Sequence, residues 1–185
     1  MVKHYFKICS KMTLLHIGTQ IFSLILSLFV FGVMLSAKAG WYFMSFATSV
    51  YYAITVYSSA YKIADKDTKS YSEHKPYILK GLVITIPTIL ITLILTALYD
   101  FSFRHVFLDY DVQMKTQFII HNLFMGWDFT FEGFRIGAGA SISIFYWILC
   151  YGLMPIASFL GYFAGMKHYD FGYKFFSAIV YKKEK

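Results

Sequence analysis

Residues 81–99 read GLVITIPTILITLILTALY, a run without a single Asp, Glu, Lys or Arg. Three further stretches, at about residues 13–35, 41–61 and 137–165, also lack all four charged residue types. Each stretch is long enough for a helix that crosses the hydrocarbon core of a bilayer, which takes ~20 residues. The sequence therefore predicts an all-α integral membrane bundle of four transmembrane helices.

The composition agrees with this class. The chain has 185 residues, of which 58% are hydrophobic and 15% charged, and its mean hydropathy is +0.55. So little polar surface does not suit a water-soluble domain. The uncharged runs are also too long for the alternating strands of a membrane barrel, which have ~10 residues. We expect one transmembrane domain over residues 1–185, with a long outer loop at 100–136 between the third and fourth helices.

The distribution of charge predicts the orientation of the chain. If the N- and C-termini are cytoplasmic, the inner segments hold 13 of the 17 basic residues and five of the ten acidic ones, a net charge of +8, against −1 outside. The positive-inside rule selects this arrangement. We expect a multi-pass protein of the plasma (inner) membrane whose basic side meets an anionic inner leaflet. Nucleic acid is not an expected partner, because the basic residues flank the apolar spans.

The N-terminal region allows two interpretations. Lys3, Lys7 and Lys11 precede the first apolar run, and Ala37-Lys38-Ala39 follows it, which resembles a secretory signal with a cleavage site. Against this, the polar lead is long and the next apolar span begins at once. We therefore expect a retained helix, preceded over residues 1–12 by a short helix lying on the membrane surface.

Two connections have distinct patterns. Residues 62–76 are polar and end in Pro76, which predicts a cytoplasmic loop. Within the outer connection, residues 113–126 are too few and too polar to span a bilayer. They predict a helix, which either lies on the outer surface or forms a re-entrant segment.

Small and polar residues recur at helical spacing within the four spans. They can pack helices closely together or line a polar path between them. Packing is the favoured interpretation, because none of these positions carries a charge of the kind that marks ion or proton pathways. Pro87 and Pro155 are expected to interrupt or kink the third and fourth helices. The residues predicted to pack the helices together or to line a polar path between them are His16, Gln20, Ser23, Ser27, Ser45, Ser49, Thr85, Thr88, Thr92, Thr96, Gly161 and Gly165.

The outer connection also holds a cluster of ionisable residues. His105, Asp109, Asp111 and His121 are the candidates there for metal binding or acid–base chemistry. Their spacing matches no known metal or catalytic motif, so solvated loop charge is the default interpretation. The chain also lacks a Walker A sequence, a dinucleotide fingerprint, G-x-S-x-G and C-x-x-C. We accordingly predict no catalytic residue, metal or cofactor.

Two stretches resemble a known group of proteins. They are Leu79-Lys-Gly-Leu-Val-Ile-Thr-Ile-Pro87, and Met154-Pro-Ile-Ala-Ser-Phe-Leu-Gly-Tyr-Phe-Ala-Gly165 followed by Ile179-Val-Tyr-Lys-Lys183. Both are similar to segments of small uncharacterised membrane proteins of low-GC Gram-positive bacteria. The resemblance covers about a fifth of the chain. It implies a bacterial inner-membrane setting and no mechanism.

Three functions remain open from the sequence. The leading hypothesis is a non-catalytic integral membrane protein, either an accessory subunit that binds other membrane subunits or a bundle that associates with itself. The alternative is a small permease or channel component for an unidentified solute. The third is an outward-facing membrane enzyme built on the outer cluster.

Overall fold

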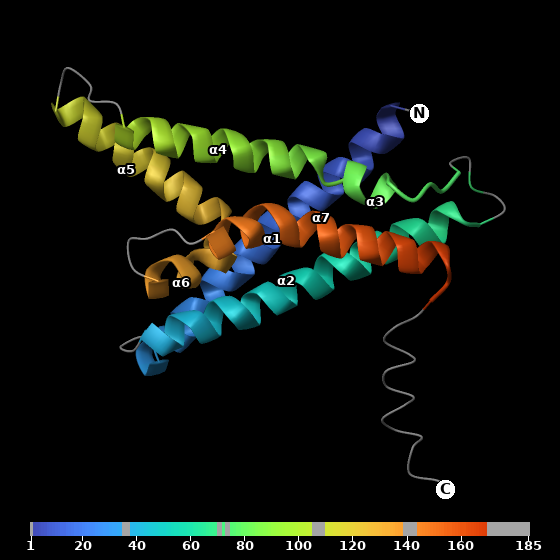
Figure 1. The fold of residues 1–185 in the computed structure, drawn as a ribbon, viewed down its shortest axis with the longest axis horizontal. Coiled ribbons are helices and arrows are strands. Elements are labelled where there is room, and N and C mark those ends of the chain that lie inside the picture. Colours follow the sequence, from blue (N-terminus) through green and yellow to red (C-terminus); the bar gives the residue numbers. More distant parts are fainter. Residues whose placement is uncertain are drawn as a thin grey trace, which may run out of the picture.

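The structure confirms the all-α class. The computed structural model describes residues 2–34, 38–69, 72, 75–104, 110–138 and 144–169, and its regular elements there are all helices. The four long helices run roughly along the long axis of the molecule, except the N-terminal one, which crosses it obliquely (Figure 1). The elements are α1 (Val2–Met34), α2 (Lys38–Asp67), α3 (Lys80–Val83), α4 (Ile86–Arg104), α5 (Tyr110–Trp127), α6 (Phe129–Ala138) and α7 (Ile144–Met166).

The helices alternate in direction, so the segments predicted to be cytoplasmic gather at one end. The start of α1, the end of α2, the whole of α3 and the end of α7 lie together at this end (Figure 1). Here it is termed the basic end, because Lys62, Lys66, Lys69, Lys75 and Lys167 lie in these segments. The end of α1, the start of α2 and the start of α5 lie at the opposite end.

Two of the expected helix boundaries are wrong. The separate surface helix at 1–12 does not exist, because α1 continues from Val2 through Thr13 without a break. Lys7 and Lys11 stay exposed on one face, while Ile8 and Met12 are buried on another, so the lysines do not end the helix. The loop predicted from residue 62 starts later, because α2 continues to Asp67.

The third apolar run is interrupted, as the proline predicts. The turn at Ile84 and Thr85 separates α3 from α4, and Pro87 occupies the second position of α4. A proline has no backbone N–H to donate, so it is tolerated in a first turn but not in a helix interior. The Thr85 hydroxyl donates to the carbonyl of Leu82 at 2.7 Å. Pro155, by contrast, lies inside the continuous helix α7.

The outer connection at 100–136 is helical over most of its length. The helix expected at 113–126 is confirmed and is longer, since α5 covers Tyr110–Trp127 and α6 follows it. The buried ring of Phe124 packs against Tyr99 of α4, with ring centroids 4.9 Å apart. This apolar face holds α5 along α4, and a solvated loop would leave it exposed.

Glycines of α7 allow that helix to touch α2. A Cβ atom on Gly161 would lie 2.9 Å from the carbonyl carbon and the Cα atom of Tyr57, and one on Gly165 would lie 2.7 Å from Cβ of Ala64. Real Cβ atoms do not approach other atoms so closely. The predicted glycine positions thus serve close packing inside this chain.

A buried ion pair joins α2 to α3 near the basic end. Lys80 and Tyr162 both donate to Oδ2 of Asp67, each at 2.7 Å. The Lys80 side chain is fully buried, and its Nζ lies 5.2 Å from the ring centroid of Tyr5. Because Asp67 carries this pair, the last turn of α2 is fixed against α3 and α7.

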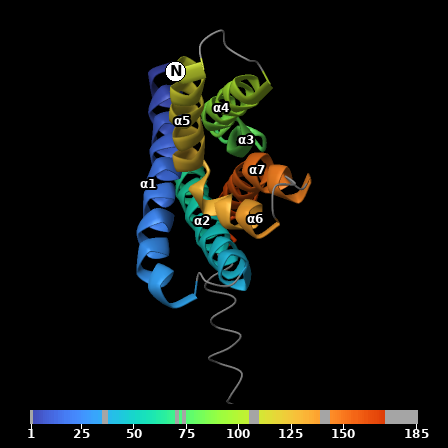
Figure 2. The same cartoon turned by 90° about the vertical axis from the view of Figure 1, so that its left-hand side faces the viewer.

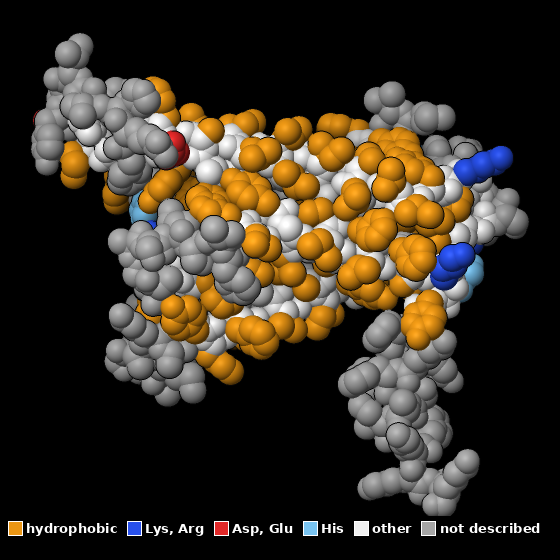
Figure 3. Space-filling view, viewed as in Figure 1, with side chains coloured by type: hydrophobic (Ala, Val, Ile, Leu, Met, Phe, Trp, Pro, Cys, Tyr) orange, Lys and Arg blue, Asp and Glu red, His pale blue; other side chains and the backbone are white. Residues whose placement is uncertain are grey.

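The surface of the long helices is strongly apolar. Leu14 of α1, Phe46 of α2, Ile94 of α4 and Ile148 of α7 are all between 58% and 67% exposed. Figure 3 shows hydrophobic side chains across the middle of the molecule, with the Lys and Arg side chains of that view at the basic end. Two described stretches, His4–Leu28 and Tyr146–Met166, are long and apolar enough to cross a membrane, and Ile86–Ser102 is apolar but shorter.

Candidate functional site

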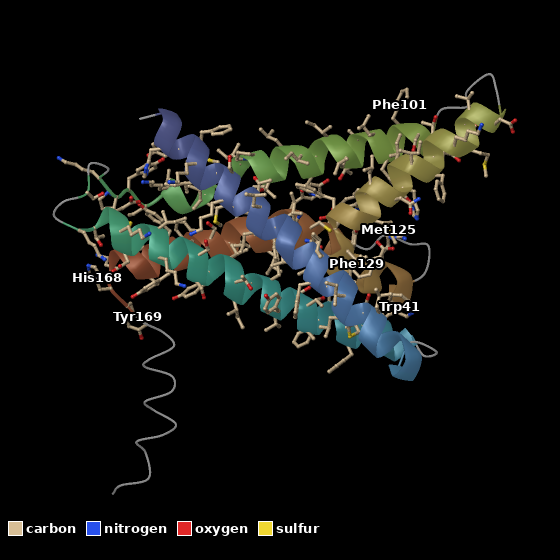
Figure 4. All side chains as sticks on the ribbon, turned by 180° about the vertical axis from the view of Figure 1, so that it is seen from behind. Trp41, Phe101, Met125, Phe129, His168 and Tyr169 are labelled. Atoms are coloured by element: carbon tan, nitrogen blue, oxygen red, sulfur yellow. The ribbon has the colours of Figure 1, made fainter. Side chains whose placement is uncertain are left out.

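Helices α5 and α6 form a hairpin that enters the bundle from the opposite end. Helix α5 returns along α4, and α6 turns back beside α2 (Figure 1). Figure 2 shows α5 beside α1, and Figure 4 labels Met125 and Phe129 on the two sides of the turn. The backbone N–H of Asp128 donates to Phe124, and that of Phe131 donates to Asp128. We define residues 127–130 as the hairpin tip.

The histidine predicted on the first span binds the tip. His16 Nε2 donates to the Trp127 carbonyl at 3.0 Å, and Nδ1 lies 2.8 Å from the Tyr52 hydroxyl. Because a carbonyl can only accept, the proton is on Nε2 and a neutral ring accepts from Tyr52 at Nδ1. His16 and Tyr52 lie near the middle of α1 and α2, so the tip reaches the middle of the bundle.

Every polar atom of Thr130 has a partner from α1 or α2. The backbone N–H donates to Gln20 Oε1 at 2.7 Å, and the side-chain hydroxyl lies 2.9 Å from Ser23 Oγ. The carbonyl accepts from Thr48 at 3.1 Å. On the other side of the tip, the Trp127 indole donates to Thr92 of α4 at 2.8 Å. Predicted packing residues on α1 and α4 thus satisfy the irregular backbone and side chains of the tip.

The bond from Thr130 to Gln20 allows a direct test. In Gln20→Leu the buried N–H of Thr130 loses its acceptor, and an unsatisfied buried donor costs about 1–3 kcal/mol. We expect the free energy of unfolding, measured by denaturant titration in detergent micelles, to fall by this amount. Asn122→Leu is the matched control, because Asn122 is exposed on α5 and bonds only to Phe118 in its own helix. An equal loss in the two variants would contradict the assigned role of Gln20.

The other predicted packing residues lie in several environments. Thr88 bonds to Thr13 at 3.1 Å, and Thr96 accepts from Tyr151 at 2.5 Å. Ser49 is buried on α2. Ser27 and Ser45 line a pocket of about 20 Å³ beside the tip, together with Ser23, Thr48 and Glu132. Such a volume holds about one water molecule.

Two buried acidic residues lie on the hairpin, outside the four long helices. Asp128 is 1% exposed, and neither of its carboxylate oxygens has a hydrogen-bond partner among the described residues. Glu132 is equally buried and forms an ion pair with Arg135, while its Oε2 has no partner. Burial raises the pKa of the Asp128 carboxyl, and the neighbouring Glu132 carboxylate raises it further. Burial also raises the pKa of Glu132, against the opposing effect of Arg135.

The outer cluster predicted from the sequence does not assemble in the part that the structure describes. Asp111 is exposed in the first turn of α5, and the His121 ring lies 5.9 Å from that of Tyr99. Ten residues of helix separate Asp111 from His121 by about 15 Å. His105 and Asp109 lie outside the described residues. Among the described residues, no three His, Cys, Asp or Glu side chains gather to hold a metal ion.

Sequence reasoning missed the residues that form the tip. Asp128 and Glu132 counted only among the ionisable residues of the outer loop, and Trp127 only among the aromatic residues expected at the outer membrane interface. Thr130 had no predicted role. One signal was available: residues 116–127 are free of charge and largely apolar, which is unusual for a solvated loop. That stretch indicates burial of the segment leading to Asp128.

Comparison with known proteins adds no relative. No protein-family model, curated protein or solved structure matches the chain. The resemblance to small bacterial membrane proteins stays a prediction.

Proposed function

We propose that this chain is a four-pass protein of the plasma membrane with cytoplasmic termini, in which α1, α2, α4 and α7 span the bilayer. The apolar surface of these helices supports the proposal, because exposed side chains of this kind suit lipid rather than water. The lysines at the basic end support the orientation. On this topology the α5–α6 hairpin is a re-entrant segment that enters from the outside.

We further propose that the protein is a small permease, or the membrane component of one. The observation that carries this proposal is the buried Asp128 carboxyl at the hairpin tip, which has no hydrogen-bond partner in the part of the chain that the structure describes. An ionisable side chain at membrane depth is costly and marks ion, proton or substrate pathways. Re-entrant and broken helices also place binding groups at the middle of transporters. The sequence favoured packing over transport because the four predicted spans contain no Asp, Glu, Lys or Arg of the kind that marks a pathway. Asp128 is such a residue, and it comes from the hairpin and not from a span.

The association hypothesis loses part of its support. The glycines of α7 pack against α2, and His16, Gln20 and Ser23 bind the hairpin tip of the same chain. These residues are therefore engaged within the chain and no longer indicate a partner. An accessory-subunit role and an outward-facing enzyme both stay predictions without a site to support them.

Transport is tested with the purified protein in liposomes on a solid-supported membrane. Concentration jumps of protons, Na⁺, K⁺, amino acids and sugars are expected to produce a charge displacement for at least one of these solutes. Asp128→Asn should abolish this signal, because it removes the ionisable group. Asp111→Asn should retain it, because Asp111 is exposed at the far end of α5. A correctly folded wild-type protein that gives no signal with any of these solutes would contradict the proposed function.

Orientation is tested by cysteine labelling of intact cells. In a chain whose Cys9 and Cys150 are replaced by Ser, Lys69→Cys and Asp111→Cys each introduce one thiol at an exposed position. A membrane-impermeant maleimide should label the thiol at position 111 and reach the one at position 69 only after the cells are opened. The reverse pattern would invert the proposed topology.

A further inference from the structure

We propose that Asp128 is a proton-binding site, whose carboxyl group is protonated while the hairpin tip is closed against α1, α2 and α7. The inference deepens the proposed function, because it names the ion that a permease would take up at this position, and the importance of the site for transport rests on that function. The site itself rests on the contacts around Asp128.

The first argument is the lack of a compensating positive charge. The cation closest in sequence on the hairpin, Arg135, is engaged by Glu132. His16 is buried, and burial favours its neutral ring, which then accepts from Tyr52 at Nδ1. The ionisable groups that face the Asp128 and Glu132 region are His16 of α1, Tyr52 of α2, His121 of α5, Glu132 and Arg135 of α6, and Tyr146, Cys150 and Tyr151 of α7. Four of these eight groups, Tyr52, Tyr146, Cys150 and Tyr151, are neutral acids at neutral pH, so they do not offset a carboxylate.

The second argument concerns which ligand fits. Multivalent metal ions need several carboxylate, thiolate or imidazole ligands, and the described residues offer no group of three. The neighbouring pocket accommodates about one water molecule, which is too little for a hydrated ion. A buried carboxylate without a counter-ion is instead neutralised most cheaply by a proton. A proton needs no cavity.

The third argument is that Asp128 differs from the other described aspartates. Asp65 and Asp67 each have a lysine partner, and Asp100 and Asp111 are exposed. Among the described aspartates, only the Asp128 carboxyl is both buried and without such a partner. Of the aspartates that the structure describes, Asp128 is therefore the one from which we expect the signal of a protonated carboxyl group at neutral pH.

Infrared spectroscopy of the full chain in lipid films tests the site. A protonated carboxyl group gives a C=O stretching band that is absent for a carboxylate. We expect this band at neutral pH, a shift to lower frequency when aspartate is labelled with ¹³C, and loss of the band as the pH rises well above the titration range of exposed carboxyls. Asp128→Asn should remove the band, and the matched variant Asp111→Asn should leave it unchanged.

Several outcomes would overturn the inference. These are no protonated-carboxyl band at neutral pH, a band that does not respond to ¹³C-aspartate, and loss of the band when Na⁺ is added at constant pH. The last result would assign Asp128 to cation binding. The isotope shift is measured on the wild-type chain, so the test holds even if Asp128→Asn fails to fold.

The infrared band tests the proton-binding site and the transport signal tests the permease, so either proposal can be rejected without the other. A titrating band in a protein that transports none of the solutes would confirm the site and reject the permease. Transport without the band would keep the permease and reject the site.

Discussion

Gly161→Ala is expected to destabilise the fold by at least about 3 kcal/mol, the upper part of the range for overpacked cores. A Cβ atom at this position would meet the backbone of Tyr57, including its carbonyl carbon and Cα atom at 2.9 Å. Backbone atoms cannot rotate away as the end of a long side chain can, so α2 and α7 would have to separate. The free energy of unfolding in detergent micelles measures the effect.

Gly152→Ala is the matched control in the same helix. The nearest atoms to a Cβ there are the tips of Ile156 and Ile148, at 3.7 and 3.9 Å, which is ordinary contact. Replacing a helical glycine by alanine without a clash should stabilise by about 0.5–1 kcal/mol. If the two variants lose stability equally, close packing at Gly161 is not the cause.

Lys80→Met is expected to cost about 3–5 kcal/mol, because removing one partner of a buried ion pair leaves the other charge uncompensated. Asp67 would keep only its bond from Tyr162. Asp67→Asn removes the stranded charge and still accepts from Tyr162, so the double variant should recover most of the loss. A double-mutant cycle of unfolding free energies measures this coupling.

The exposed pair at the end of α2 is the control for this cycle. Lys69 lies 3.4 Å from Asp65, and both side chains are more than a third exposed. Lys69→Met should change stability by less than about 1 kcal/mol, the usual value of a surface pair. A comparable loss at the two lysines would show that burial of Lys80 does not set the energy of its pair.

Helical periodicity identified the correct faces of the spans but not what they contact. His16, Gln20 and Ser23 do share a face, and all three bind the hairpin tip. Their partners lie 107 to 111 residues later in the chain. A local repeat contains no information about such a distant partner, so the sequence favoured packing between the spans.

Charge marked the ends of the spans only approximately. Lys7 and Lys11 reach solvent from one face of a continuous helix, so the apparent start at residue 13 came too late. The charges of Asp128 and Glu132 led to the opposite error, because they made a buried segment look like a solvated one. A charge usually indicates a solvated loop, and their burial depends on α1, α2 and α7 closing around the tip, which no local pattern records.

The hairpin tip also imposes an order on how the protein is made. Its backbone groups at Trp127 and Thr130 bond to His16, Gln20 and Thr48, which the ribosome completes some eighty or more residues earlier. On the proposed topology those groups would lie in lipid without a partner, and each unsatisfied one costs several kcal/mol. The hairpin therefore enters stably only after α1 and α2 have docked together, and α7, synthesised last among the described helices, closes over it. In a nascent chain that stops before α6, we therefore expect α1 and α2 to be docked together already.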